Sequence, residues 1–204
     1  MEKVHHLFIL PGLGKHEAIL ELIRRNWEKE FDIQIHILAI DWHDNTKDFK
    51  QKIISLTNQI KPYSTNKNST ISLLGISAGA SAAINVWKNM NLEVESIILV
   101  CGRVKEGKAR GARTLHWASR NSPSFKESVL ESERNLKKLS PNDNTKILIF
   151  YSLLDELVPP NDARINGAKN LYLIVPEHVL SIVFSMIFYK KIITEHILTL
   201  KRES

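Results

Sequence analysis

The sequence predicts an α/β protein with three layers, α/β/α, built on a doubly wound, mostly parallel, six-stranded sheet. Two observations predict it. Short apolar runs alternate along the chain with segments of helical periodicity, which is typical of successive β–α units. Several of the runs, such as 97–100 and 147–150, are apolar throughout, as in strands that a parallel sheet buries on both faces.

The apolar runs place the strands, and the helices are expected between and after them. We expect strands over 6–10, 33–40, 70–76, 96–101, 146–151 and 170–175. We expect helices over 16–29, 46–60, 78–89, 125–139, 160–168 and 178–200. In such sheets ligands bind at the carboxyl ends of the strands, so the residues that follow each strand are the first candidates for chemistry.

Length and composition indicate one globular domain. The 204 residues are 43% hydrophobic and 25% charged, with enough chain to bury a single large core. We expect one domain over 1–204. Residues 102–144, between the fourth and fifth strands, would form a short, basic, cap-like insertion.

The single cysteine, Cys101, excludes an internal disulfide and a cysteine-based zinc cage, and it favours a reducing compartment. The first apolar run is too short for the core of a signal peptide. The longest mostly apolar stretch, 179–189, is 11 residues, against roughly 20 for a membrane span. We therefore expect a cytoplasmic protein without a membrane span.

A candidate nucleophile follows the third strand. Gly75-Ile76-Ser77-Ala78-Gly79 has the pattern G-x-S-x-G between a strand and an alanine-rich helix. The serine of such a turn needs glycine two residues before and after it, because side chains there would collide with the neighbouring strand and helix. The helix N-terminus would also favour a nearby oxyanion. The alternative is a glycine-flanked turn whose serine only caps the helix.

Two further candidates follow the fifth and sixth strands. Asp155 lies where a carboxylate could orient an imidazole, although it could also be a turn or capping residue before Pro159. His178 follows the last strand at the head of a helix, the place for a general base. The other seven histidines lie in strands, in the last helix or in loops and compete less well.

The glycine turn Pro11-Gly12-Leu13-Gly14 follows the first strand. Its backbone N–H groups could complete an oxyanion hole with the N–H of Ala78. The sequence lacks a phosphate-binding loop, a dinucleotide fingerprint and any cluster with metal-ligand spacing. We therefore expect neither a cofactor nor a metal.

These residues resemble the α/β-hydrolase superfamily, whose chain order is Ser…Asp…His. The resemblance implies a minimal α/β-hydrolase fold and a catalytic triad of Ser77, Asp155 and His178, with the N–H groups of Leu13 and Ala78 as the oxyanion hole. The sequence departs from the pattern in several places. The usual first pair of strands is missing, Ser152 and Glu177 replace common glycines, and Glu177 could compete for the imidazolium.

The substrate pocket is expected to involve Gly12, His16, Ile76, Arg103 and Trp117. The net charge of +6 bears on this pocket, because residues 103–126 hold seven bases and one acid while the rest of the chain is balanced. That segment is either a basic flap that favours phosphate or carboxylate groups on the substrate, or a solvated loop.

The function that these residues predict is a serine hydrolase that cleaves a carboxylic ester or thioester of a small or accessible acyl substrate, which could be anionic. The alternatives are a non-catalytic binding module with the same fold, or an acyltransferase that uses the same triad. Nucleic-acid binding is not expected, because the basic segment shows no aromatic-interleaved recognition motif. The sequence does not determine the acyl group, the leaving group or the oligomeric state.

Overall fold

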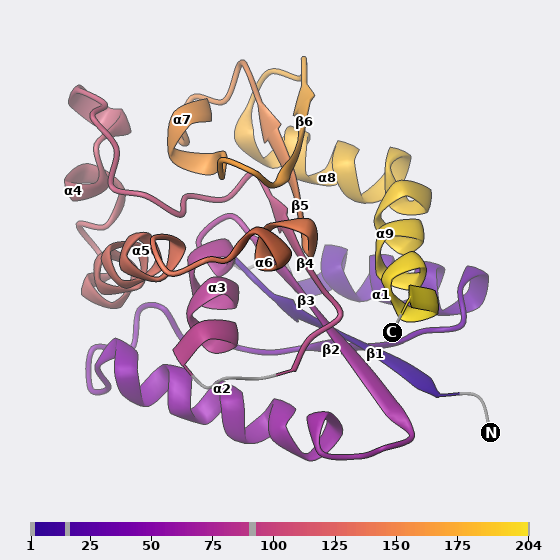
Figure 1. The fold of residues 1–204 in the computed structure, drawn as a ribbon. Helices are drawn as coiled ribbons and strands as arrows, with labels where there is room; N and C mark the ends of the chain where they lie inside the picture. Colours follow the sequence, from indigo (N-terminus) through magenta and orange to yellow (C-terminus); the bar gives the residue numbers. More distant parts are fainter. Residues whose placement is uncertain (1–2, 15–16, 90–92, 204) are drawn as a thin grey trace.

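The computed structural model describes residues 3–14, 17–89 and 93–203, and it contains one six-stranded sheet with the order β2-β1-β3-β4-β5-β6. All neighbouring strands are parallel (Figure 1). The strands are β1 (Val4–Leu10), β2 (Gln34–Ile37), β3 (Ser69–Ile76), β4 (Ser96–Val100), β5 (Ile147–Ser152) and β6 (Lys169–Leu173). The six-stranded parallel sheet predicted from the sequence is confirmed.

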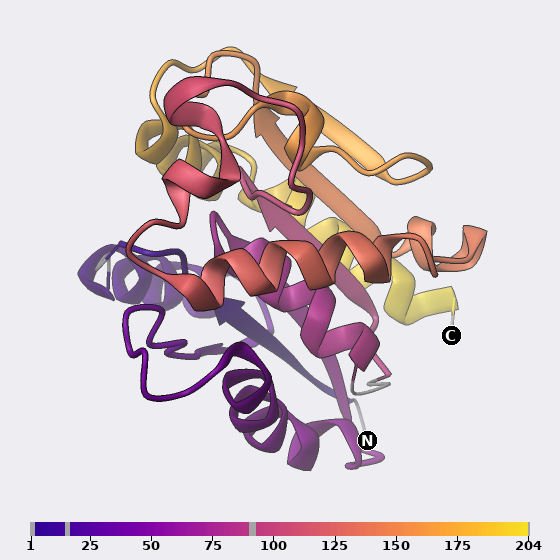
Figure 2. The same cartoon turned by 90° about the vertical axis from the view of Figure 1, so that its left-hand side faces the viewer.

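Helices cover both faces of the sheet. One face carries α1 (Glu17–Glu30), α8 (His178–Phe188) and α9 (Lys190–Glu203). The other carries α2 (Phe49–Ser64), α3 (Gly79–Asn89) and α5 (Pro123–Leu136), and Figure 2 looks onto these three. The shorter helices are η1 (Gly111–Arg113), α4 (Leu115–Ala118), α6 (Pro141–Thr145) and α7 (Pro160–Ala163). The protein therefore has the three layers that the sequence predicts.

Buried side chains alternate between the two layers along each central strand. In β1, Leu7 and Ile9 pack toward α1 and α8, while Phe8 and Leu10 pack toward α2 and α3. Successive side chains of a strand point to opposite faces, and here both faces are dry. This double burial explains why the strands read as continuous apolar runs rather than as alternating ones.

The observed boundaries differ most from the predicted ones in three places. The helix expected over 160–168 is only Pro160–Ala163. The strand expected over 33–40 is only Gln34–Ile37, although Ile40 remains in the core. The helix expected over 178–200 is divided into α8 and α9 at Tyr189. Tyr189 leaves the helical conformation (φ −105°, ψ 12°), and its ring packs edge-on against Phe150 at 5.3 Å between centroids.

No helix in the described ranges is long and apolar enough to cross a membrane.

The segment 102–144, expected as a cap-like insertion, consists of two different parts. Its second part holds α5, which packs against α3 and buries Phe125 and Val129 in the core. The side chain of Asn85 on α3 also donates to the carbonyl of Ser128 on α5 at 2.8 Å. α5 is thus a layer helix, and only the irregular first part, which contains η1 and α4, lies outside the layers (Figure 2).

His6 and His36, on adjacent strands, are expected to make the stability of the fold depend on pH. His6 on β1 and His36 on β2 are 3.0 Å apart, Nδ1 to Nε2, and burial lowers the pKa of both, with His36 lowering that of His6 further. At pH values around the pKa of unfolded histidine, about 6.5, the folded protein therefore binds fewer protons than the unfolded chain. Stability is expected to be complete above that pH and to fall as the pH drops below it.

Urea unfolding at pH 7.5 and 5.5 measures this effect: the midpoint is expected to be lower at pH 5.5. His36→Asn should flatten the dependence, whereas His116→Asn, at an exposed position, should leave it unchanged. An equal midpoint at both pH values would contradict the assignment.

Candidate active site

Ser77 lies in the tight turn between β3 and α3, with a backbone φ of +53°. A non-glycine residue adopts this conformation only when its surroundings impose it. The N–H of Ser77 donates to the carbonyl of Val100 on β4 at 3.0 Å, and its carbonyl accepts from the N–H of Ala80 at 3.1 Å. The turn is therefore held by the neighbouring strand and by the first turn of α3.

Glycines allow the backbone to come this close. A Cβ at Gly75 would lie 2.5 Å from the Cα of Ala80, and one at Gly79 would lie 1.9 Å from the carbonyl oxygen of Leu10. Gly102, which the sequence analysis did not single out, has the same role, because its Cβ would lie 2.0 Å from the Cβ of Ala80. The glycines around Ser77 are thus required by close contacts with α3 and with the end of β1.

A methyl group at Gly79 is expected to destabilise the fold. Gly79→Ala forces the end of β1 away from α3, at a cost of about 3 kcal/mol in the free energy of unfolding. Gly111→Ala is the matched control: it adds the same methyl group in open space at φ +64° and should cost only about 1 kcal/mol. Denaturant titration of both variants measures the difference, and equal losses would show that close approach is not what requires glycine at 79.

The three residues of the predicted triad form a chain of hydrogen bonds. The Oγ of Ser77 is 2.9 Å from Nε2 of His178, and Nδ1 of His178 is 2.7 Å from Oδ2 of Asp155. Because the carboxylate can only accept, Nδ1 carries the proton and Nε2 is free to accept the proton of Ser77. His178 and Asp155 are only 4% and 3% exposed. The sheet brings together residues that are 101 positions apart in the sequence.

The loop after β5 fixes the carboxylate of Asp155. Its second oxygen, Oδ1, accepts from the N–H groups of Leu157 and Val158, both at 2.8 Å. Ser152, at the end of β5, donates to the carbonyl of Val175 beyond β6 at 2.6 Å. Ser152 therefore ties together the two loops that carry Asp155 and His178.

Two other reactive groups next to the site do not compete with the triad. The carboxylate of Glu177 accepts from the N–H groups of Val179 and Leu180, and these bonds lower its pKa. Glu177 thus caps α8 instead of competing for the imidazolium as the sequence suggested. Burial, and then the charge of Asp155, raise the pKa of Cys101, so its sulfur stays a thiol rather than a nucleophilic thiolate.

Backbone N–H groups of the predicted oxyanion hole are available beside Ser77. Among the hydrogen bonds of the described residues, none uses the N–H of Leu13 or of Ala78. Two carbonyl groups anchor the turn that carries Leu13. Trp42 donates to the carbonyl of Pro11 at 3.1 Å, and a ring nitrogen of His43 lies 3.3 Å from the carbonyl oxygen of Leu13. A Cβ at Gly12 would lie 2.8 Å from the Cβ of Ser77, so this turn approaches the serine directly.

Arg103, expected to bind substrate, is instead a buried structural residue with 1% of its surface exposed. Its guanidinium donates to the carbonyls of Arg113 (2.6 Å) and Leu157 (3.2 Å) and lies 3.5 Å from the carboxylate of Asp162. Arg113 donates to the carbonyl of Asp155 at 2.9 Å. Burial lowers the pKa of Arg103, and the charge of Asp162 opposes this effect. Arg103 and Arg113 therefore both hold the Asp155 loop.

Removing one partner of the buried pair is expected to destabilise the protein strongly. Arg103→Ala leaves Asp162 as an unpaired buried carboxylate and removes one of the two arginine hydrogen bonds to the Asp155 loop, which should cost about 3–5 kcal/mol in the free energy of unfolding. The double variant Arg103→Met/Asp162→Leu removes both charges and should regain part of that loss. Denaturant titration of both variants tests this. A double variant less stable than Arg103→Ala would show that the ion pair is not the source of the loss.

Ser77 and His178 open into an apolar groove of about 260 Å³ between α1 and α8. The predicted residues Gly12, Leu13 and Ile76 line it. Trp117 does not: it lies on α4, 42% exposed, with the guanidinium of Arg120 at 3.8 Å from its ring centroid. His16 lies outside the described residues. The residues of α1 and α8 that line the groove, other than His178, were not predicted. The available signal was α8 itself, which is apolar on nearly all sides although a helix packed on a sheet needs only one apolar face.

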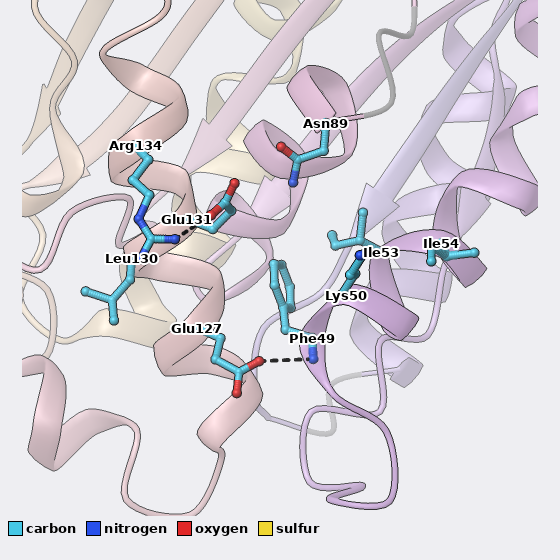
Figure 3. A pocket seen from close by; sticks show the side chains of 9 residues that line it. All are labelled: Phe49, Lys50, Ile53, Ile54, Asn89, Glu127, Leu130, Glu131 and Arg134. Carbon is cyan, nitrogen blue, oxygen red and sulfur yellow. Dashed lines mark hydrogen bonds and ion pairs between the residues drawn. The ribbon is translucent and has the colours of Figure 1, made fainter.

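A larger groove of about 570 Å³ lies between α2 and α5 on the opposite face (Figure 3). Its described lining combines apolar side chains such as Phe49 and Leu130 with charged ones such as Glu127 and Arg134, and it includes neither a histidine nor a hydroxyl or thiol side chain. It therefore has no counterpart of the hydroxyl–imidazole pair that Ser77 and His178 form. Within the part of the chain that the structure describes, no three His, Cys, Asp or Glu side chains come together to hold a metal.

Solved structures of α/β hydrolases have the same fold. An α/β-hydrolase enzyme from the metagenome of lagoon sediments at Mar Chica, Morocco, aligns over 100% of this chain and 94% of its own, with a TM-score of 0.67 and 17% identity. A structure from a study of two metagenome-derived lipolytic enzymes, LipS and LipT, aligns over 100% and 96% (TM-score 0.65, 12% identity). One from a study of carboxylesterases of the thaumarchaeon Nitrososphaera gargenis aligns over 98% and 92% (TM-score 0.67, 12% identity).

No protein-family model and no curated protein matches the sequence. The structural alignments span nearly the whole of each chain, so the expectation of an α/β-hydrolase fold is confirmed.

Proposed function

We propose that this protein is a serine hydrolase that cleaves a carboxylic ester or thioester through an acyl-enzyme. The observation that carries the proposal is the chain of hydrogen bonds from Ser77 through His178 to Asp155, with contacts of 2.9 and 2.7 Å. A non-catalytic binding module would not need a base within direct reach of the serine. The esterase and lipolytic neighbours in the structural comparison give further support.

The first half of the proposed reaction acylates the serine. Ser77 Oγ attacks the acyl carbonyl while His178 Nε2 takes its proton, and Asp155 stabilises the imidazolium that forms. The carbonyl oxygen becomes an oxyanion, which accepts hydrogen bonds from the N–H groups of Leu13 and Ala78. When the tetrahedral intermediate collapses, the bond to the leaving group breaks, and His178 gives its proton to the departing alcohol or thiol.

The second half releases the acid. His178 takes a proton from water, the resulting hydroxide adds to the acyl carbon, and Ser77 leaves with the proton that His178 returns.

An alcohol or amine in place of water would make the protein an acyltransferase with the same residues. Added acceptors such as glycerol, with the acylated product measured, distinguish transfer from hydrolysis.

The placement of the charged residues bears on the substrate. The described residues of the groove beside Ser77 carry no carboxylate, ammonium or guanidinium group, and Arg103 is engaged behind Asp155. We therefore propose a neutral acyl group rather than the anionic one that a basic flap over the site would favour. We also infer a single domain and, from the lone Cys101, a cytoplasmic location.

The proposal predicts that activity depends on the hydroxyl of Ser77. Ser77→Ala should lower the hydrolysis of p-nitrophenyl butyrate by about 10⁴- to 10⁶-fold, because neither the oxyanion hole nor the base can replace the nucleophile. A fluorophosphonate probe should label the wild-type protein at Ser77, as located by peptide mass spectrometry.

Ser55→Ala is the matched control, since it removes a hydroxyl from an exposed position on α2. It should keep both activity and labelling. Full hydrolysis by Ser77→Ala, or labelling at another residue, would overturn the proposal.

A further inference from the structure

The groove that begins at Ser77 continues between two helices. Both α1 and α8 begin at the carboxyl edge of the sheet and run away from it (Figure 1). The side chains that face the groove come from one turn of each helix and are Ile19, Leu20, Ile23, Val179, Ile182 and Val183. Four residues of helix rise about 6 Å, so the groove extends at least one helical turn beyond the serine.

The chemistry of the lining selects what can enter. Ser77 and His178 are the polar side chains among its described residues, and Leu157 of the Asp155 loop also lines it. A carboxylate or ammonium group placed deeper would lose its hydration without finding a partner. An alkyl chain, in contrast, would bury its surface against side chains of both helices.

The volume limits the length of the chain. About 260 Å³ holds roughly eight groups the size of a water molecule, at about 30 Å³ each. The part of the substrate that stays bound through both steps of an acyl-enzyme reaction is the acyl chain, whereas the leaving group must depart and water must enter. An apolar groove between two packed helices suits the acyl chain.

We propose that the groove between α1 and α8 binds the acyl part of the substrate, as an unbranched, uncharged chain of about four to eight carbons. This inference rests on the proposed hydrolase function. Val183, partly exposed on α8, is one of the residues one turn beyond the mouth, and it is the position where a larger side chain would shorten the groove.

Two series of esters test the proposal. In the first, p-nitrophenyl esters carry acyl chains of two to twelve carbons; in the second, acetate esters carry alcohols of the same lengths. For the wild type, kcat/KM should rise up to about fourfold with each methylene of the acyl chain, to a maximum near eight carbons. It should vary little with the alcohol. A suberate monoester, which ends in a carboxylate, should react about 100-fold more slowly than the octanoate ester.

The variants locate the groove. Val183→Trp should lower kcat/KM for the octanoate ester at least tenfold and leave that for the acetate ester within twofold. Ile187→Trp, on the same helix at a half-exposed position outside the groove, should change neither. Thermal unfolding checks that both variants fold. An unfolded Val183→Trp is replaced by Val183→Phe, with the same expectation.

The outcomes separate the two proposals. A wild type that hydrolyses esters equally at all acyl lengths, follows the alcohol length, or prefers the suberate monoester overturns the acyl groove and leaves the serine hydrolase standing. An unchanged octanoate rate in a folded Val183 variant overturns it as well. A wild type that hydrolyses no ester and is not labelled at Ser77 overturns the proposed function, and the acyl groove with it.

Discussion

The backbone of Ser77 is the constraint on which the rest of the site depends. Its positive φ is unfavourable for a serine, and it persists because β4 accepts its N–H and α3 donates to its carbonyl. The backbone around the turn is also packed too closely for side chains: Gly79 lets α3 approach the end of β1, and Gly102 lets the chain after β4 approach α3. The position of the serine hydroxyl therefore depends directly on how the central strands and α3 pack around the turn.

The basic segment shows a different use of charge from the one that its composition suggests. Arg103 and Arg113 turn inward and donate to carbonyls of the Asp155 loop, while N–H groups of the same loop donate to the carboxylate of Asp155. The carbonyl groups of the loop thus accept hydrogen bonds from the two arginines, and its N–H groups donate hydrogen bonds to the carboxylate of Asp155. Part of the positive charge therefore orders the site from behind, out of reach of a substrate.

The sequence was most informative where function is encoded locally. The pattern around Ser77, and the places of Asp155 and His178 after their strands, could be read because a parallel sheet brings the carboxyl ends of its strands to one edge. The burial of Arg103 could not be predicted, because it depends on Asp162, which lies 59 positions further along the chain. The groove was missed for a related reason: periodicity shows that α1 and α8 each bury a face, but it does not show that the faces leave a space between them.

The distance in sequence between Ser77 and His178 also has a consequence for the order in which the protein matures. During synthesis, β1, β3 and the serine turn leave the ribosome long before the loops that carry Asp155 and His178. The hydrogen bond to the serine forms only after β5 and β6 have joined the sheet and α8 has docked on it. A chain that ends before β6 and α8 therefore lacks the imidazole beside Ser77, and under the proposed function its serine has no base to activate it.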